Sequence, residues 1–144
     1  MIKPLPLKLF LKTFDYAPRL AISLVVLNAR GEVLLARRAI APGVGSWHLP
    51  GGFILKGESF QQCIQRLVRK ELGLKMSAKL AKQTGAFENL HKDPRGHVVD
   101  LIYILKVSAA PRPTKETQEI KFFKKLPAVI GFGHGDILRE LGYK

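Results

Sequence analysis

The pattern of apolar and polar positions predicts strands on both sides of one well-defined helix. Residues 59–72 carry apolar side chains every three or four positions, which is typical of one buried helix face. Ser59 and Gln62 match a capping box, and Gly73 stands where such a helix ends. Runs rich in β-branched and apolar residues predict strands at 20–27, 32–37, 81–88, 97–107 and 119–123.

Turn residues and glycines divide the rest of the chain. Residues 28–31 predict a turn, so the first two strands are expected to form a hairpin. Residues 40–52 are rich in glycine and proline and predict an ordered loop around Trp47. Residues 126–142 predict a final helix interrupted by glycines. Strands around a central helix, with a second helix at the end, predict an α+β fold or a three-layer α/β/α sandwich.

One carboxylate interrupts the apolar face of the predicted central helix. At about 100° per residue, Glu71 falls in the same stripe as Phe60, Ile64 and Leu67. Burying an unpaired carboxylate there is costly, and the helix dipole adds to the cost in the last turn. Two interpretations follow. Glu71 lies past the edge of the core, solvated or paired with a lysine, or it binds a metal ion beside backbone carbonyls of the glycine-rich loop.

Composition limits the classes of function. The 144 residues, 47% of them apolar, suffice for one core and predict a single domain over residues 1–144. The net charge of +13 favours anionic partners, although nucleic acid is not expected because the known recognition motifs are absent. A single cysteine, Cys63, and the lack of a signal peptide or membrane span predict a soluble, cytoplasmic protein without a membrane partner. A homodimer is left open.

The spacing of four elements resembles a known motif. Gly52, Glu58, Arg66 and Glu71-Leu-Gly-Leu74 reproduce the frame of the Nudix box, Gly-x5-Glu-x7-Arg-Glu-U-x-Glu-Glu-x-Gly-U, where U is aliphatic. The lead-in Trp47-His-Leu-Pro-Gly-Gly52 and the strands ending at Arg38 and at Phe122-Phe123 also match, so the resemblance covers most of the chain. It implies an α/β/α sandwich with a mixed central sheet. It also implies a divalent cation, Mg²⁺ with Mn²⁺ as the alternative, held against a nucleoside diphosphate derivative.

The chain departs from the box at two of its glutamates. Leu67 and Lys70 replace them, and Glu71 remains. GDP-mannose mannosyl hydrolases resemble this chain in the same loss, and they cut the sugar C–O bond with one Mg²⁺ that stabilises the departing diphosphate. This resemblance implies a Mg²⁺-dependent hydrolase of nucleotide sugars. The chain lacks that branch's catalytic histidine and has Ser23 where the branch has an acidic residue.

The resemblance also implies roles for individual residues. Metal ligands are Glu71, the carbonyl of Gly51 and Gln118, with Glu116 as the alternative to Gln118. The catalytic residues are Glu71, Arg38 as a diphosphate clamp, and Glu116 or Glu119 as base. Substrate-binding residues are Arg37, Arg38, Trp47 and Lys70, although Trp47 also fits a loop anchor. Glu58 and Arg66 support the site or simply form a salt bridge with each other.

The sequence also supports alternative functions. Asp93-Pro-Arg-Gly-His97 resembles a segment of ADP-ribose pyrophosphatases, and it is also good turn chemistry. The alternative functions are therefore a pyrophosphohydrolase of ADP-ribose or related nucleoside diphosphate derivatives, and a nucleotide-binding Nudix protein with impaired catalysis. The histidines lack the spacing of a metal cage, and His91 is the one that we consider as a base.

Overall fold

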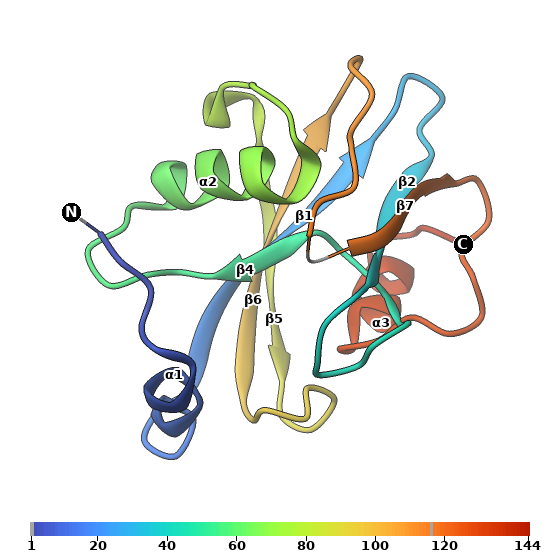
Figure 1. The fold of residues 1–144 in the computed structure, drawn as a ribbon. Helices are drawn as coiled ribbons and strands as arrows, with labels where there is room; N and C mark the ends of the chain where they lie inside the picture. Colours follow the sequence, from blue (N-terminus) through green and yellow to red (C-terminus); the bar gives the residue numbers. More distant parts are fainter. Residues whose placement is uncertain (1, 116) are drawn as a thin grey trace.

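The computed structural model describes residues 2–115 and 117–144 of the chain (Figure 1). The helices are α1 (Leu7–Thr13), α2 (Phe60–Leu72) and α3 (His134–Glu140), with a 3₁₀ turn η1 (Ala78–Leu80). The strands are β1 (Arg19–Leu27), β2 (Val33–Arg38), β3 (Trp47–His48), β4 (Gly51–Phe53), β5 (Lys82–Asn89), β6 (Val98–Lys106) and β7 (Thr117–Phe123). None of the described helices is both long and apolar enough to cross a membrane.

The strands form one mixed sheet, as predicted. Its order is β3-β2-β1-β6-β5, with β4 beside β1 and β7 beside β2. β1 and β6 are parallel, and the other pairs are antiparallel. The predicted hairpin is formed, because β1 and β2 are antiparallel neighbours joined by the turn at residues 28–31, but their pairing is short and lies at Leu27 and Val33. Earlier in β1, residues 21–23 pair with β4 instead, so β1 and β2 diverge.

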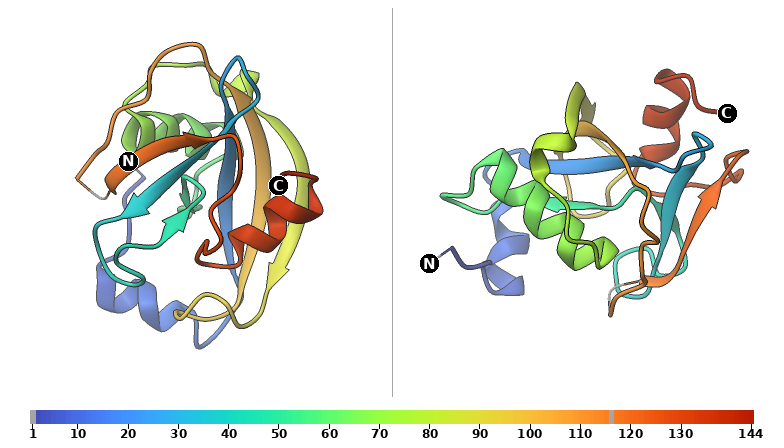
Figure 2. Two further views of the ribbon diagram at one scale, coloured as in Figure 1. Left: turned by 90° about the vertical axis from the view of Figure 1, so that its right-hand side faces the viewer. Right: turned by 90° about the horizontal axis from the view of Figure 1, so that it is seen from above.

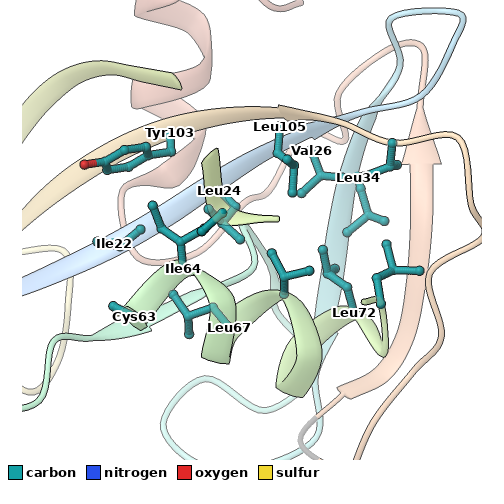
Figure 3. Close-up of a cluster of buried hydrophobic side chains, with 14 of the residues drawn as sticks. Ile22, Leu24, Val26, Leu34, Cys63, Ile64, Leu67, Leu72, Tyr103 and Leu105 are labelled. Carbon is teal, nitrogen blue, oxygen red and sulfur yellow. The ribbon is translucent and has the colours of Figure 1, made fainter. Parts of the chain in front are cut away.

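Side chains of β1 alternate between two cores, which gives the sandwich its layers. Ile22, Leu24 and Val26 join the cluster that α2 covers (Figure 3). Val25 and Leu27 join a second cluster, which includes Ile137 and Leu138 of α3. The two helices therefore cover opposite faces of the sheet, and Figure 2 shows them on its two sides. This is the predicted α/β/α arrangement.

Helix α2 has the predicted boundaries, and its buried face differs at one residue. The Ser59 and Gln62 capping box is formed, and Gly73 ends the helix in the left-handed conformation. Phe60, placed by the periodicity in the buried stripe, is 44% exposed. The buried part of the helix begins one turn later, at Cys63, because the first turn extends beyond the core cluster.

Three short elements were not predicted. Helix α1 has no side-chain N-cap and contains no buried residue, so neither a capping signal nor a core-facing stripe marks it. Strand β3 lies within the glycine-rich loop 40–52, and β4 begins in its last two residues. The final helix is shorter than predicted, because Phe132 and Gly133 both have positive φ and end the preceding loop just before His134.

Two glycines of β4 allow close contact with the neighbouring elements. A Cβ on Gly51 would lie 2.4 Å from the backbone oxygen of Ile22, whereas one on Gly52 would lie 2.8 Å from the side-chain Cδ2 of Leu67. The backbone cannot yield without breaking the β1–β4 pairing, but the end of a leucine side chain can rotate. Gly51 is therefore a stricter requirement of the fold than Gly52.

We predict that Gly51→Ala lowers the free energy of unfolding by about 1–3 kcal/mol, as overpacking typically does, and that Gly52→Ala lowers it less. Urea unfolding of both variants, followed by circular dichroism, measures the difference. Equal losses, or a larger loss for Gly52→Ala, would contradict the close approach of β4 to β1.

Candidate active site

A cavity of about 870 Å³ lies where β1 and β2 diverge. Its wall includes β4, the last turns of α2, the loop before β6 and the start of α3. Three carboxylates line it, namely Glu71, Asp93 and Asp100. Seven cationic side chains line it, namely Lys3, Arg19, Arg38, Lys56, Arg66, Lys70 and Arg95. This excess of positive charge favours an anionic ligand.

Glu71 lies in this cavity wall, together with Gly51 and Lys70. It is 6% exposed, so the interpretation that it lies solvated past the core edge is wrong. Leu67, which replaces a box glutamate, also lines the cavity and is buried in the core under α2 (Figure 3). Because its side chain packs into that core, its position cannot supply a charge to the site.

The donors at this point suit a hard cation with few protein ligands. Among the described residues, no three His, Cys, Asp or Glu side chains are grouped to hold a metal ion. Glu71, which carries a carboxylate, and Gly51, whose carbonyl the resemblance names as a ligand, line the same cavity. Mg²⁺ binds through one or two carboxylates and keeps several waters, so this small donor set fits one such ion.

Glu58 and Arg66 form the predicted salt bridge. Arg66 donates from Nε and Nη2 to the two carboxylate oxygens of Glu58, over 2.7 and 2.9 Å. The hydrogen bond from Arg66 holds the pKa of Glu58 below its usual value. Arg66 also donates to the carbonyl of Phe53, and the Leu55 amide donates to Glu58. The pair therefore ties the loop after β4 to α2.

A buried acid that the sequence analysis missed lies on β6. Asp100 is 2% exposed and accepts a 2.9 Å hydrogen bond from the hydroxyl of Ser23 on β1. Burial raises its pKa to about 6. Ser23 occupies the place where the resemblance led us to look for an acid, and the neighbouring strand supplies one. The sequence does indicate this residue, because Asp100 is an acidic residue within the apolar run 97–107. Glu71 was identified in the same way, as an acidic residue on an apolar helix face.

The segment from Asp93 to His97 is a turn, and its residues Asp93 and Arg95 line the cavity. The amide of Gly96 donates to the carbonyl of Asp93, which closes the turn. Arg95 donates from Nε and Nη2 to both carboxylate oxygens of Asp93, over 2.9 and 2.8 Å. The guanidinium lies 4.9 Å from the ring centre of Phe53 and 5.5 Å from that of Phe132. The interpretation of this segment as a turn is therefore confirmed.

Two histidines of the cavity wall have defined hydrogen bonds. The amide of Leu49 donates to Nδ1 of His134, and burial lowers the pKa of His134 to about 3, so this ring is neutral. Nδ1 of His48 lies 2.7 Å from the carbonyl of Leu49. A carbonyl only accepts, so Nδ1 of His48 carries the proton and donates to it. Within residues 2–115 and 117–144, neither ring belongs to a group of three side chains that could hold a metal ion.

The two neighbouring arginines of β2 differ in position. Arg38 lines the cavity, and its guanidinium lies 5.4 Å from the ring centre of Phe132. Arg37 does not line it, because alternate residues of a strand point to opposite faces. Arg37 instead lies over Trp47 at 5.8 Å, and Trp47 packs against Phe123. Trp47 is therefore placed as a loop anchor rather than as part of the cavity wall.

Several other candidates lie away from this cavity. Gln118 and Glu119 are exposed on β7, and neither lines it. His91 is exposed and does not line it either. Glu116 lies outside the described residues. Cys63 is fully buried, and burial raises its pKa to about 12, so it is an inert core residue as expected.

Asp100 makes a testable contribution to the pH dependence of stability. Its pKa in the folded protein, about 6, lies above the ordinary value of 3.8, so between these pH values the folded state holds the proton more tightly. The free energy of unfolding therefore falls as the pH rises through this range. An asparagine at position 100 cannot ionise, so the Asp100→Asn variant does not show this fall in the free energy of unfolding. The fall amounts to about 2–3 kcal/mol in the wild type.

Urea unfolding of Asp100→Asn and of the wild type at several values between pH 4 and pH 7 checks this. We expect the stability of the variant relative to the wild type to increase up to about pH 6 and then stay constant. A difference that does not change with pH would show that Asp100 ionises normally.

Two curated proteins of known activity are similar to this chain in sequence. A curated relative, an ADP-ribose pyrophosphatase from Methanocaldococcus jannaschii, is 30% identical over 118 residues, which cover 80% of this chain and 68% of the relative. An NAD-capped RNA hydrolase, NudC from Pseudomonas aeruginosa, is 48% identical over 62 residues, but the match covers 42% of this chain and only 22% of that protein.

The fold has close counterparts among solved structures. The NUDIX domain of Shewanella oneidensis NrtR, determined in complex with ADP-ribose, matches with a TM-score of 0.72 at 23% identity, over 95% of this chain and 97% of that one. A profile of the NUDIX domain matches residues 17–130, which include β1 to β7 and the whole box. Together with the cavity bounded by Gly51 and Glu71, this match shows that the chain belongs to the Nudix family.

Proposed function

We propose that the protein is a Mg²⁺-dependent pyrophosphohydrolase of ADP-ribose or a closely related nucleoside diphosphate derivative. The observation that carries the proposal is the juxtaposition of Glu71 and Gly51 with seven cationic side chains on one cavity. The similarity to an ADP-ribose pyrophosphatase over most of the chain favours this substrate over GDP-mannose. Asp93 and Arg95 line the same cavity, and they belong to the segment whose sequence resembles one in ADP-ribose pyrophosphatases.

The cationic side chains that line the cavity would bind the diphosphate. Arg38 and Lys70 lie on the same cavity as Glu71 and can neutralise charge on the two phosphates. Arginine suits this role because its guanidinium binds phosphate oxygens in pairs. Arg95 is already paired with Asp93, so its part is to hold Phe53 and Phe132 in place.

Glu71 and the carbonyl of Gly51 would hold the divalent cation. The ion supplies charge stabilisation for the phosphoryl oxygens when it is bound. Mn²⁺ also prefers carboxylate, carbonyl and water oxygens, so it is the alternative ion. Glu58 and Arg66 keep this loop and helix together without belonging to the ligand set.

Asp100 is the carboxyl best suited to accept the proton of the attacking water. It lines the cavity, and its pKa of about 6 lies near neutrality, where a general base is effective. Water attacks one phosphorus, its proton passes to Asp100, and the bond to the bridging oxygen breaks. With ADP-ribose the products are AMP and ribose 5-phosphate.

Cleavage of a sugar C–O bond in a nucleotide sugar is the second candidate. The loss of two box glutamates, at Leu67 and Lys70, favours it, because one cation suffices to stabilise a departing diphosphate. This reaction releases the nucleoside diphosphate and a free sugar. A site that binds nucleotides without turnover is the remaining alternative from the sequence.

We predict that the protein converts ADP-ribose to equal amounts of AMP and ribose 5-phosphate when Mg²⁺ is present, and that EDTA stops the reaction. Glu71→Gln should lower kcat on the order of a hundred-fold or more, because it weakens the cation that stabilises developing charge. Glu140→Gln changes an exposed glutamate on α3 and is the matched control, with unchanged kcat expected.

Product analysis by chromatography gives both halves of the reaction. A melting temperature of Glu71→Gln close to that of the wild type shows that lost activity does not reflect unfolding. Near-normal activity of Glu71→Gln would remove Glu71 from the site, and binding of ADP-ribose by the wild type without any products would favour the binding protein.

A further inference from the structure

The N-terminal segment, residues 2–16, forms part of the wall of the candidate active site. The NUDIX profile begins at residue 17, so this segment lies outside the matched part of the chain. Its residues nevertheless line the same cavity as Glu71. They are Lys3, Pro4, Leu5, Leu7, Phe10 and Thr13. The segment therefore adds a surface to the cavity that the matched part of the chain does not provide.

Helix α1 turns one side toward this cavity. Leu7, Phe10 and Thr13 line it and are three positions apart, so they follow one another along one side of the helix. Four other residues of the helix do not line it, namely Lys8, Leu9, Leu11 and Lys12. The segment therefore has a side that meets the cavity and a side that meets only solvent.

Aromatic contacts fix the position of this wall relative to the proposed cation site. The rings of Phe10 and Phe14 lie 5.1 and 5.6 Å from the ring of Phe53 on β4. The guanidinium of Arg19 lies 5.5 Å from the ring centre of Phe10. Phe53 follows Gly51 by two residues on β4, which is about 7 Å along a strand. The wall therefore lies beside the proposed cation site, at a distance that a nucleoside spans.

The side chains of the wall are mainly apolar. Pro4, Leu5, Leu7 and Phe10 are apolar, and the first acidic residue of the chain is Asp15. Leu5 and Leu7 are 44% and 71% exposed, so a ligand in the cavity can reach them. Apolar and aromatic side chains form most of the surface in sites for small molecules, and the flat face of a nucleobase suits them better than a phosphate or a ribose does.

We propose that the N-terminal segment binds the nucleobase of the substrate, with Leu5 and Leu7 packing against the face of the base. This inference rests on the proposed function, because it takes the substrate to be a nucleoside diphosphate derivative. The diphosphate lies with the cations Arg38 and Lys70, and the base extends from it along β4 toward Phe53. The segment does not touch the reacting phosphorus, so it contributes to affinity and to the choice of substrate.

Isothermal titration calorimetry of the full chain with ADP and, separately, with inorganic pyrophosphate tests the inference in the presence of Mg²⁺. The double variant Leu5→Ser with Leu7→Ser should bind ADP about ten-fold more weakly than the wild type, because it removes apolar contact with the base. Its affinity for pyrophosphate, which has no base, should be unchanged. In turnover of ADP-ribose, KM should rise by the same factor while kcat stays constant.

The matched control is Leu9→Ser with Leu11→Ser, which changes two leucines of α1 that are 50% and 42% exposed and do not line the cavity. We expect this pair to bind ADP like the wild type, although it places two serines in the helix. An equal loss of ADP affinity in both double variants would overturn the inference. Unchanged ADP affinity in Leu5→Ser with Leu7→Ser, or an equal loss for pyrophosphate, would overturn it as well.

The same measurements separate this inference from the proposed function. Binding of ADP by the wild type without hydrolysis of ADP-ribose would overturn the proposed pyrophosphohydrolase. A ten-fold loss of ADP affinity confined to Leu5→Ser with Leu7→Ser would still support the base-binding wall in that case. Hydrolysis of ADP-ribose with the same KM in this variant and in the wild type would support the enzyme and overturn the wall.

Discussion

The close approach of β4 to β1 and α2 determines most of the structure described here. Gly51 and Gly52 have no side chains, so β4 can pair with β1 at residues 21–23 and lie against Leu67. β4 therefore takes the place beside β1 that β2 would otherwise occupy, and the cavity lies where these strands diverge. Phe53, the next residue, anchors α1 on one side and stacks with Arg95 on the other.

The close packing of β4 against β1 and α2 also brings residues from distant parts of the sequence to one cavity. Gly51 comes from the loop, Glu71 from α2, Asp100 from β6 and His134 from α3. The salt bridge between Glu58 and Arg66 keeps the loop and α2 at this distance. The site therefore combines few carboxylates with many cations, and this combination fits a diphosphate and a single divalent ion.

Local signals predicted α2 and placed Glu71 on its apolar face, whereas the pairing of strands distant in the sequence could not be predicted. The capping box, Gly73 and the helical period all lie within residues 59–73, so the sequence was sufficient for them. Ser23 and Asp100 are 77 positions apart, and only the register of β1 with β6 brings them together. Helix α1 was missed because it buries nothing, and Arg37 was misplaced because the facing of β2 was unknown.

The proposed function is tested most directly by determining which bond the protein breaks, a P–O bond of the diphosphate or the sugar C–O bond. The protein is incubated with ADP-ribose and, separately, with GDP-mannose in oxygen-18 water, and the products are analysed by mass spectrometry. We expect oxygen-18 to enter a phosphate group of the products, because the proposed base Asp100 would direct water to phosphorus. Label on the C1 hydroxyl of free mannose, with unlabelled GDP, would contradict it and establish cleavage of the sugar C–O bond.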